Sequence, residues 1–238
     1  SNTKKDICSV VVDGFGDRST ASISQVVDQT EINELWQCPY PISLGLFYSS
    51  ITDYLGFAIN EGEYKVMGLS SYGDSNSKSA KLVSNLMGWD SNSYQLISDM
   101  SYFDYHVSFS NSYSSKLEEL LGPARNPFIP LIPGDSDFQR CADIARGAQD
   151  LIVYLLCKIF THAHKLTKSR RFLFSGGVSM NSASIESIAQ MPFVDEIIIP
   201  PSPGDAGCAI GAAFYCYLKS NNFNNLNISK PTLFPSLK

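Results

Sequence analysis

The stretch that decides the fold runs from residue 171 to 219 and reads RFLFSGGVSMNSASIESIAQMPFVDEIIIPPSPGDAGCAIGAAFYCYLK. Its apolar start, 171–174, predicts a buried strand that ends in a glycine turn, and 179–190 then predicts a helix. A second strand is expected at 196–199 and a second helix at 205–219. A strand, a turn and a helix repeated in this way are typical of a parallel sheet packed by helices.

Three more strands are expected near the beginning of the chain. Residues 7–12 (ICSVVV) are apolar and β-branched, 19–27 alternate in polarity, and 31–38 have the pattern of a third strand. Tight connections between these segments predict an antiparallel meander.

Two helices and a less regular region lie between the two groups of strands. Apolar residues at helical spacing predict helices over 43–55 and 143–166. The region 74–140 is rich in Ser, Asn, Asp and Tyr, and we interpret it as an inserted lobe. Within that lobe we expect local elements in three places, namely strands near 94–97 and 102–107 and a helix near 116–121.

This order of elements predicts an α/β fold, a ribonuclease-H-like or actin-like half-domain. We expect a mixed sheet with a three-stranded antiparallel meander and flanking helices, plus the inserted lobe. Folds of this kind consist of two similar halves that close on a nucleotide, and the chain contains one of them. The expected organisation is a first part of the half-domain at 7–73, the lobe at 74–140, a second part at 141–220, and an Asn-rich, poorly ordered tail or linker at 221–238.

Composition narrows the class of protein. Among 238 residues, 44% are hydrophobic and 17% charged, as in ordinary globular proteins, and the net charge of −5 argues against binding to nucleic acid. No apolar run is long enough for a membrane helix, and no signal peptide is apparent. The six cysteines form no C-x-x-C pair, which argues against a zinc cluster and favours reduced thiols in a cytoplasmic protein.

The first candidate site is the turn Asp13-Gly14-Phe15-Gly16-Asp17. Gly14 and Gly16 allow backbone amides to approach an anion closely, because glycine has no Cβ. A carboxylate at the end of a strand, here Asp13, is placed to hold a metal or to orient a phosphate-bound water. The alternative is a plain hairpin turn.

The second candidate is 175–181, Ser-Gly-Gly-Val-Ser-Met-Asn. Gly176 and Gly177 suit a ligand over the start of the next helix, where free N–H groups point at it. Asn181 is placed to hydrogen-bond a ribose or a base. The alternative is a compact turn with Ser179 as N-cap, and the segment lacks the lysine and spacing of a Walker loop.

Two further residues are candidates for contacts with charged ligands. Asp205 follows a proline-rich loop and is placed to bind a metal, although an N-cap needs no ligand. Lys65 is able to neutralise a phosphate, but 60–73 has the composition of a loop, and a surface lysine is the commoner case. His162 and His164 are two apart on a helix and make a poor metal pair, so we interpret them and His106 as structural or surface residues.

Five segments in order resemble the nodulation-type and antibiotic O-carbamoyltransferases, over the second half of their actin-like domain. That domain is itself similar to the tRNA threonylcarbamoyltransferases. The matching segments are VVDGFGD (11–17), SLGLFY (43–48), KVMGLSSYG (65–73), FSGGVSMN (174–181) and the stretch 200–211 with Asp205.

The resemblance implies an enzyme that uses carbamoyl phosphate and ATP to make carbamoyl-adenylate, with release of pyrophosphate. The carbamoyl group then passes to the hydroxyl of a small-molecule or sugar acceptor. It also implies that Gly176, Gly177 and Asn181 hold the adenosine. Asp205 matches the aspartate that, with two histidines, binds a divalent metal, iron or magnesium.

The chain departs from the family pattern in two ways. It has no H-x-x-x-H motif, and the adenylate-forming domain and the first half of the actin-like domain are missing. We therefore expect an incomplete metal site and no transferase activity from this chain alone. The alternatives are a tRNA threonylcarbamoyltransferase-like enzyme, a kinase or ATPase of the same superfamily, and a non-catalytic nucleotide-binding module.

Overall fold

A computed structural model describes residues 7–26 and 32–220 of the chain. The poorly ordered tail expected at 221–238 and the first residue of the third expected strand lie outside the described residues. The chain forms two compact units. Of the described residues, unit 1 contains 7–13, 21–26, 32–37 and 160–220, and unit 2 contains 14–20 and 38–159. The boundaries expected at residues 73 and 140 differ from these and remain a prediction.

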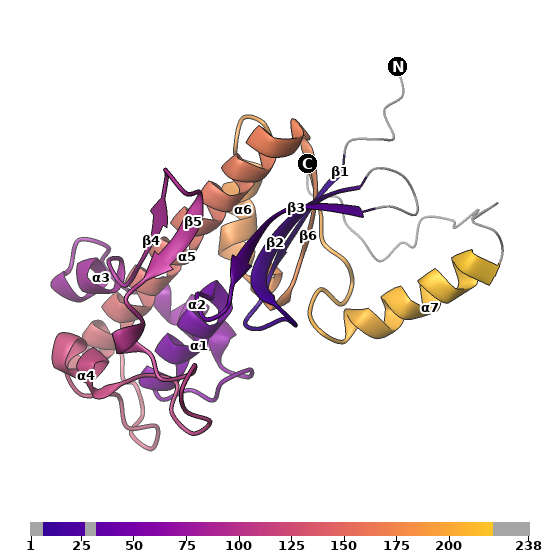
Figure 1. The fold of residues 1–238 in the computed structure, drawn as a ribbon. Helices are drawn as coiled ribbons and strands as arrows, with labels where there is room; N and C mark the ends of the chain where they lie inside the picture. The colour runs from indigo at the N-terminus through magenta and orange to yellow at the C-terminus, as the bar shows by residue number, and fades with distance from the viewer. Residues whose placement is uncertain (1–6, 27–31, 221–238) are drawn as a thin grey trace. The chain divides into compact units, whose positions relative to one another are not determined.

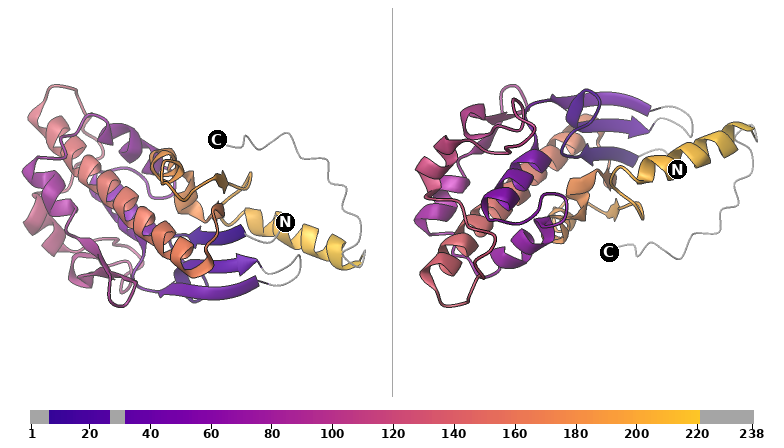
Figure 2. Two further views of the ribbon diagram at one scale, coloured as in Figure 1. Left: turned by 90° about the horizontal axis from the view of Figure 1, so that it is seen from above. Right: turned by 90° about the horizontal axis from the view of Figure 1, so that it is seen from below.

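A five-stranded mixed sheet forms the centre of unit 1, with strand order β3-β2-β1-β6-β7 (Figure 1). β1 pairs with β2 antiparallel and with β6 parallel, and β6 pairs with β7 parallel. The views of Figure 2 show the three N-terminal strands side by side in one layer. The strands are β1 (Ile7–Val12), β2 (Ser19–Val26), β3 (Ile32–Pro39), β6 (Arg171–Ser175) and β7 (Glu196–Ile198). The sequence thus predicted all five strands to within about two residues at each end.

Alternation along the strands explains which side chains form the core of the sheet. In β1 every second residue is buried, so that Cys8, Val10 and Val12 are fully covered. In the adjacent β6, Phe172 and Phe174 are fully buried, and both rings lie 5.2 Å from the ring of Phe160. The end of the long helix α5 (Ser136–Thr167) therefore packs on the sheet through aromatic contacts.

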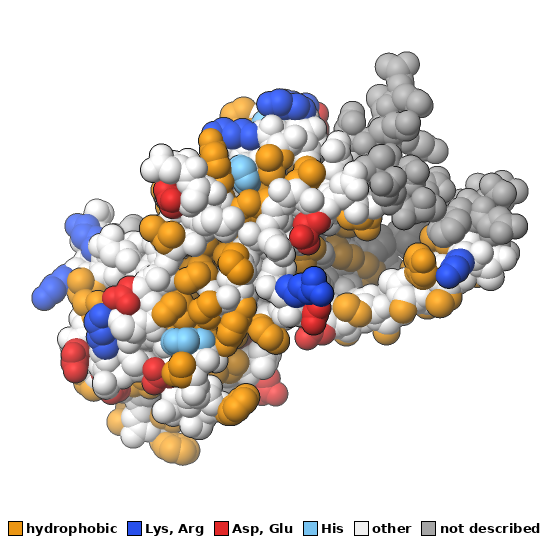
Figure 3. Space-filling model, viewed as in Figure 1, with side chains coloured by type: hydrophobic (Ala, Val, Ile, Leu, Met, Phe, Trp, Pro, Cys, Tyr) orange, Lys and Arg blue, Asp and Glu red, His pale blue; other side chains and the backbone are white. Residues whose placement is uncertain are grey.

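The helices after β6 begin later than the sequence predicted. The expected helix at 179–190 consists of a short 3-10 turn, η2 (Gly177–Met180), followed by α6 (Ser182–Ala189). The last helix is α7 (Gly207–Ser220), which has no buried residue. Its side chains Ile210, Phe214, Tyr215 and Tyr217 are between 43% and 57% exposed, and apolar side chains along α7 are visible in Figure 3.

Unit 2 is mainly helical, with one small two-stranded antiparallel sheet. The helix expected at 43–55 is α1, and Ser43 caps it by accepting the N–H of Leu46 at 3.1 Å. α1 spans Leu44–Tyr54. The other elements of unit 2 are α2 (Glu63–Ser70), α3 (Lys78–Val83), β4 (Met87–Asp90), β5 (Gln95–Ser98), η1 (Met100–Tyr102), α4 (Ser115–Leu121) and the first part of α5.

Two local predictions in unit 2 are wrong. The segment 60–73, whose glycines and serines suggested a loop, contains α2, because Val66 and Leu69 are buried and the helix packs against α1. The strand expected at 102–107 is instead the end of η1 and a loop, with a single bridge from Phe103 to Tyr113. The strand near 94–97 and the helix near 116–121 are confirmed as β5 and α4.

No helix in the described parts of the chain is both long and apolar enough to cross a membrane.

Candidate functional site

The carboxyl ends of the parallel strands of unit 1 bring three sequence segments together. β1 and β6 run parallel with Val11 opposite Ser175, and β7 lies on the other side of β6. Ligands of open α/β sheets bind at such carboxyl ends. Asp13 follows β1, the glycine turn follows β6, and the proline-rich loop follows β7.

Two hydrogen bonds, both donated by backbone N–H groups, join these segments. The N–H of Gly177 donates to Oδ2 of Asp13 at 2.9 Å, and the N–H of Gly176 donates to the carbonyl of Pro203 at 2.7 Å. The Asp13 carboxylate is therefore held in a fixed orientation by a charge-assisted bond. Both glycine amides thus bond within the protein, and contact of this turn with an adenosine over the start of the next helix remains a prediction.

Gly176 is required by backbone geometry. Its φ is +88°, and a Cβ on this residue would lie 2.1 Å from the carbonyl oxygen of Val12. Gly177 is less restricted, since its Cβ would lie 3.2 Å from Oδ1 of Asp13. The glycine pair thus allows the end of β6 to approach β1 closely, which places Asp13 at the carboxyl ends of the parallel strands.

Asn181 caps α6 in the structure. Its Oδ1 accepts hydrogen bonds from the N–H of Ser184 at 3.0 Å and from the hydroxyl of Ser184 at 2.9 Å. Ser179, which the sequence offered as N-cap, instead donates its hydroxyl to the carbonyl of Gly176 at 2.8 Å and is buried. Contact of Asn181 with a ribose or base remains a prediction.

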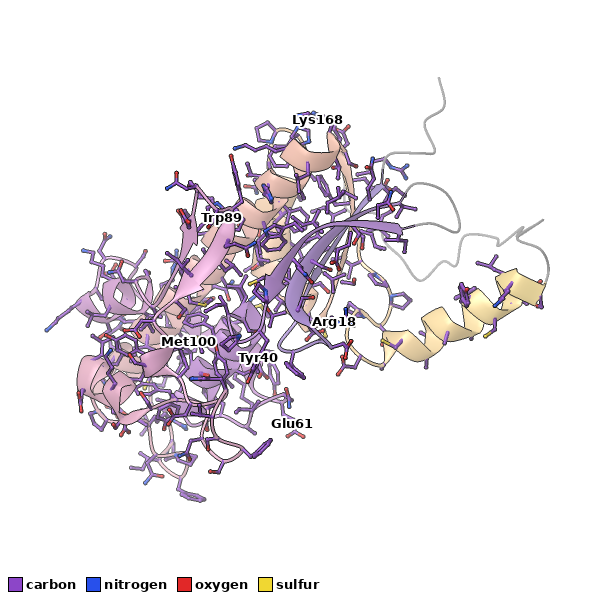
Figure 4. The ribbon with its side chains drawn as sticks, in the orientation of Figure 1. Arg18, Tyr40, Glu61, Trp89, Met100 and Lys168 are labelled. Carbon is purple, nitrogen blue, oxygen red and sulfur yellow. The ribbon has the colours of Figure 1, made fainter. Side chains whose placement is uncertain are left out.

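The glycine turn at 14–18 belongs to unit 2 and has its own anchors. Ser43, the N-cap of α1, donates its hydroxyl to the carbonyl of Gly14 at 2.6 Å. Gly16 has to be glycine, because a Cβ would lie 2.7 Å from the carbonyl oxygen of Ser19. Phe15 is 61% exposed and packs edge-on against Tyr40, labelled in Figure 4, with 5.0 Å between ring centres. Anion contacts of Gly14 and Gly16 remain a prediction.

The described residues do not fit a metal site. Asp205 is exposed in the turn before α7, and only its backbone carbonyl has a described bond, from the N–H of Cys208 at 3.0 Å. Within residues 7–26 and 32–220 no group of three or more His, Cys, Asp or Glu side chains is placed to hold a metal ion. One carboxylate is too few for a protein metal site, so we derive no step through a metal.

The histidines of α5 have structural environments, as the sequence suggested. The ring of His162 lies 6.0 Å from that of Trp36, and burial, followed by the charge of Lys165, lowers the pKa of His162. Nδ1 of His164 lies 2.7 Å from the carbonyl oxygen of Ser169, and its ring stacks on Phe193.

Lys65 lies on the exposed face of α2 in unit 2, so its predicted role with a phosphate is sterically possible. Sequence reasoning missed the Pro203 carbonyl and the Ser43 hydroxyl, which fix the glycine turns. Backbone carbonyls have no sequence signature, and Ser43 gave only the signal of a helix start.

Comparison with known proteins gives a consistent family. The model of the family described as "Carbamoyltransferase N-terminus" matches residues 3–214. The uncharacterized protein sll1178 of Synechocystis sp. is 32% identical over 205 residues, which cover 85% of this chain and 31% of that protein. The nodulation protein NolO of Bradyrhizobium diazoefficiens is 30% identical over 203 residues, which cover 85% of this chain and 33% of NolO. The chain therefore spans about a third of the length of these relatives.

Among solved structures, gluconate kinase from Lactobacillus acidophilus superposes with a TM-score of 0.48 at 13% sequence identity, covering 98% of this chain and 42% of that one.

Proposed function

The chain belongs to the carbamoyltransferase family, in the part described as its N-terminus, and on this premise we propose that it is part of an ATP-dependent O-carbamoyltransferase. In the proposed reaction the carbonyl carbon of carbamoyl-adenylate is attacked by an acceptor hydroxyl. The new C–O bond forms as the bond to the AMP phosphate breaks, and the hydroxyl proton passes to a base. The family match over residues 3–214 is the observation that carries this proposal.

The geometry at the carboxyl ends of β1 and β6 supports a nucleotide site there. Asp13 is held by the amide of Gly177, at the carboxyl ends of parallel strands where nucleotides bind in open α/β sheets. The strand order and the mixed pairing agree with half of an actin-like domain. We propose that Asp13 faces the nucleotide and orients a phosphate-bound water, and that carbamoyl phosphate and ATP are the co-substrates.

The acceptor in this proposal is a small molecule or sugar with a free hydroxyl. Because the chain spans 31% and 33% of two relatives, we propose that adenylate formation requires residues that this chain lacks. The 238-residue chain is then expected to release no pyrophosphate by itself.

The experiment uses the longer parent polypeptide with ATP, carbamoyl phosphate and a divalent cation, and identifies the nucleotide and phosphate products. Pyrophosphate that appears only with carbamoyl phosphate supports the proposal. ADP in place of pyrophosphate refutes it and indicates a kinase or ATPase. An Asp205→Ala variant of the same polypeptide then tests whether transfer to the acceptor depends on this carboxylate, with adenylate formation as the control.

An Asp13→Ala variant tests the sheet edge. It removes the acceptor of the Gly177 N–H, and the matched control is Asp17→Ala in the same turn, whose side chain is 97% exposed. Nucleotide affinity is expected to fall about tenfold or more in Asp13→Ala, since the variant loses the proposed hydrogen bond to the phosphate-bound water, and a charge-assisted bond is worth at least about 1.4 kcal/mol. Equal affinities in the two variants would exclude Asp13 from the site.

A further inference from the structure

Two positive side chains from distant parts of the sequence meet at one aromatic ring in unit 2. The ammonium nitrogen of Lys65 lies 5.8 Å from the centre of the Phe57 ring, and the guanidinium carbon of Arg125 lies 5.1 Å from it. Lys65 stands on α2, whereas Arg125 lies in the loop between α4 and α5. We call these two residues the cation pair.

Neither member of the cation pair has a carboxylate partner in the described part of the chain. The described ion pairs within 4.0 Å involve other residues. The nearby acid Glu63 is already occupied, because its carboxylate accepts the N–H groups of Asn60 and Gly62 and the hydroxyl of Ser49.

Arg125 is held in place by neutral groups. Its Nη1 donates to the carbonyls of Leu55 at 3.0 Å and Gly56 at 3.1 Å, and its Nη2 donates to that of Ile129 at 3.2 Å. Its Nε is buried without a hydrogen-bond partner. These carbonyls fix the guanidinium without adding a negative charge, so its full positive charge remains to act on an external anion.

The local backbone is adapted to Arg125. Gly56 has a φ of +70°, and a Cβ there would lie 2.5 Å from Nη1 of Arg125. Any other residue at position 56 would therefore displace the guanidinium. The position of this cation is thus built into the turn that follows α1.

The surface of α2 beside Lys65 is open. Gly68 lies one turn further along the same face, and nothing lies within 4 Å of the position that its Cβ would occupy. A glycine inside a helix lowers helix stability, and no packing contact explains it here. Tyr64, 65% exposed, borders the gap on one side, and Glu61, labelled in Figure 4, lies in the turn before the helix.

We propose that Lys65 binds the phosphate group of a small-molecule substrate that lies over Gly68 on the exposed face of α2, and that the nearby charge of Arg125 strengthens this contact. Lys65 donates directly to phosphate oxygens, because its ammonium group has only aromatic rings, those of Phe57 and Tyr64, as partners in the described structure. Arg125 is a positioning residue that supplies a fixed positive charge at the ring of Phe57. The choice between carbamoyl phosphate and ATP as the ligand rests on the proposed function, whereas the site itself rests on the geometry of unit 2.

The test measures binding directly on the 238-residue chain by titration calorimetry, with inorganic phosphate, carbamoyl phosphate and ATP as separate probes. The variant is Lys65→Met, which keeps most of the aliphatic stem, and the control is Lys78→Met, an exposed lysine of α3 in the same unit. Affinity for at least one probe is expected to fall about tenfold in Lys65→Met, the loss of one charge-assisted bond, and to stay within about twofold in the control. The probe that loses most identifies the ligand.

Gly68→Ala provides a readout that a purely structural role would not change. It is expected to raise the thermal midpoint and, at the same time, to weaken binding of the same probe. Unchanged affinity in Gly68→Ala would overturn the placement over α2, and equal affinities of Lys65→Met and Lys78→Met for all three probes would overturn the site. If Lys65→Met weakens binding but the parent polypeptide makes ADP, the site stands and the proposed carbamoyl transfer fails. If the parent polypeptide makes pyrophosphate but Lys65→Met binds all three probes normally, the proposed carbamoyl transfer stands and the Lys65 site fails.

Discussion

Replacing Gly176 by alanine tests whether the close approach of β6 to β1 at their carboxyl ends requires a glycine in the turn. The new Cβ would lie 2.1 Å from the carbonyl oxygen and 2.5 Å from the carbonyl carbon of Val12. It would also have to adopt a φ of +88°. The strands cannot separate freely, because Val11 of β1 pairs with Ser175 of β6 directly before the turn.

The expected cost follows from two contributions. A non-glycine residue in the left-handed region costs about 1–2 kcal/mol, and a forced displacement in a packed region costs about 1–3 kcal/mol. The free energy of unfolding should therefore fall by roughly 2–5 kcal/mol, out of a typical total of about 5–15 kcal/mol. The displaced turn would also lose the bonds from Gly177 to Asp13 and from Gly176 to Pro203, so nucleotide affinity should fall with stability.

The assay is urea unfolding followed by tryptophan fluorescence. The chain has two tryptophans, Trp36 in β3 and Trp89 in β4, so a Trp89→Phe background makes Trp36 the reporter of the sheet. At a slope of about 2–3 kcal/mol per molar urea, the midpoint should fall by roughly 1–2 M. The matched control is Gly204→Ala in the loop after β7, where nothing lies within 4 Å of the Cβ position. A difference between the two variants below about 0.5 kcal/mol, the usual effect of a surface substitution, would refute the reasoning.

Three further outcomes are expected. Gly68→Ala should raise the free energy of unfolding reported by Trp89 by about 1 kcal/mol, the helix propensity difference between the two residues, because the added methyl group meets no neighbour; a destabilised variant would contradict this. Burial raises the pKa of the Cys8 thiol from 9.0 to about 11, so the folded state holds this proton more tightly than the unfolded state does. The free energy of unfolding should therefore be constant below pH 9 with respect to this group. It should fall by up to about 2–3 kcal/mol between pH 9 and pH 11. Urea unfolding at pH 8 and pH 10.5 should show this loss in the wild type and a smaller one in Cys8→Ala, whereas equal losses would exclude the thiol as the cause. Tyr54→Phe should cost about 1 kcal/mol in thermal unfolding, since the hydroxyl of Tyr54 donates to the carbonyl of Gly122 at 2.7 Å; an unchanged midpoint would show that this bond adds no net stability.

Local patterns explain how much of the fold was predictable. β1 was expected at 7–12 and spans Ile7–Val12, because alternating burial in a strand depends only on the chain's own periodicity. α2 was missed, because Gly68 and Ser70 have low helix propensity and the helix is stabilised by packing of Val66 and Leu69 in unit 2. In the sequence, this packing is indicated only by two apolar residues, which are too few to predict a helix.

For the candidate site, the sequence by itself determined the residue types and the family. It placed Asp13 after one strand and Gly176-Gly177 after another, and the motifs identified the carbamoyltransferases, as the family match over residues 3–214 confirms. The parallel pairing of β1 with β6 decided that the Gly177 amide donates to the Asp13 carboxylate.

Only the tertiary structure could decide which charges act together. Lys65 precedes the lobe of weak pattern and Arg125 lies far inside it, yet both lie at the ring of Phe57. Their proximity depends on how α1, α2 and the loop before α5 pack, and charge–charge and charge–ring energies depend on distance in space. Sequence spacing carries that distance only within one helix or strand, so such a pair becomes visible only when the chain is folded.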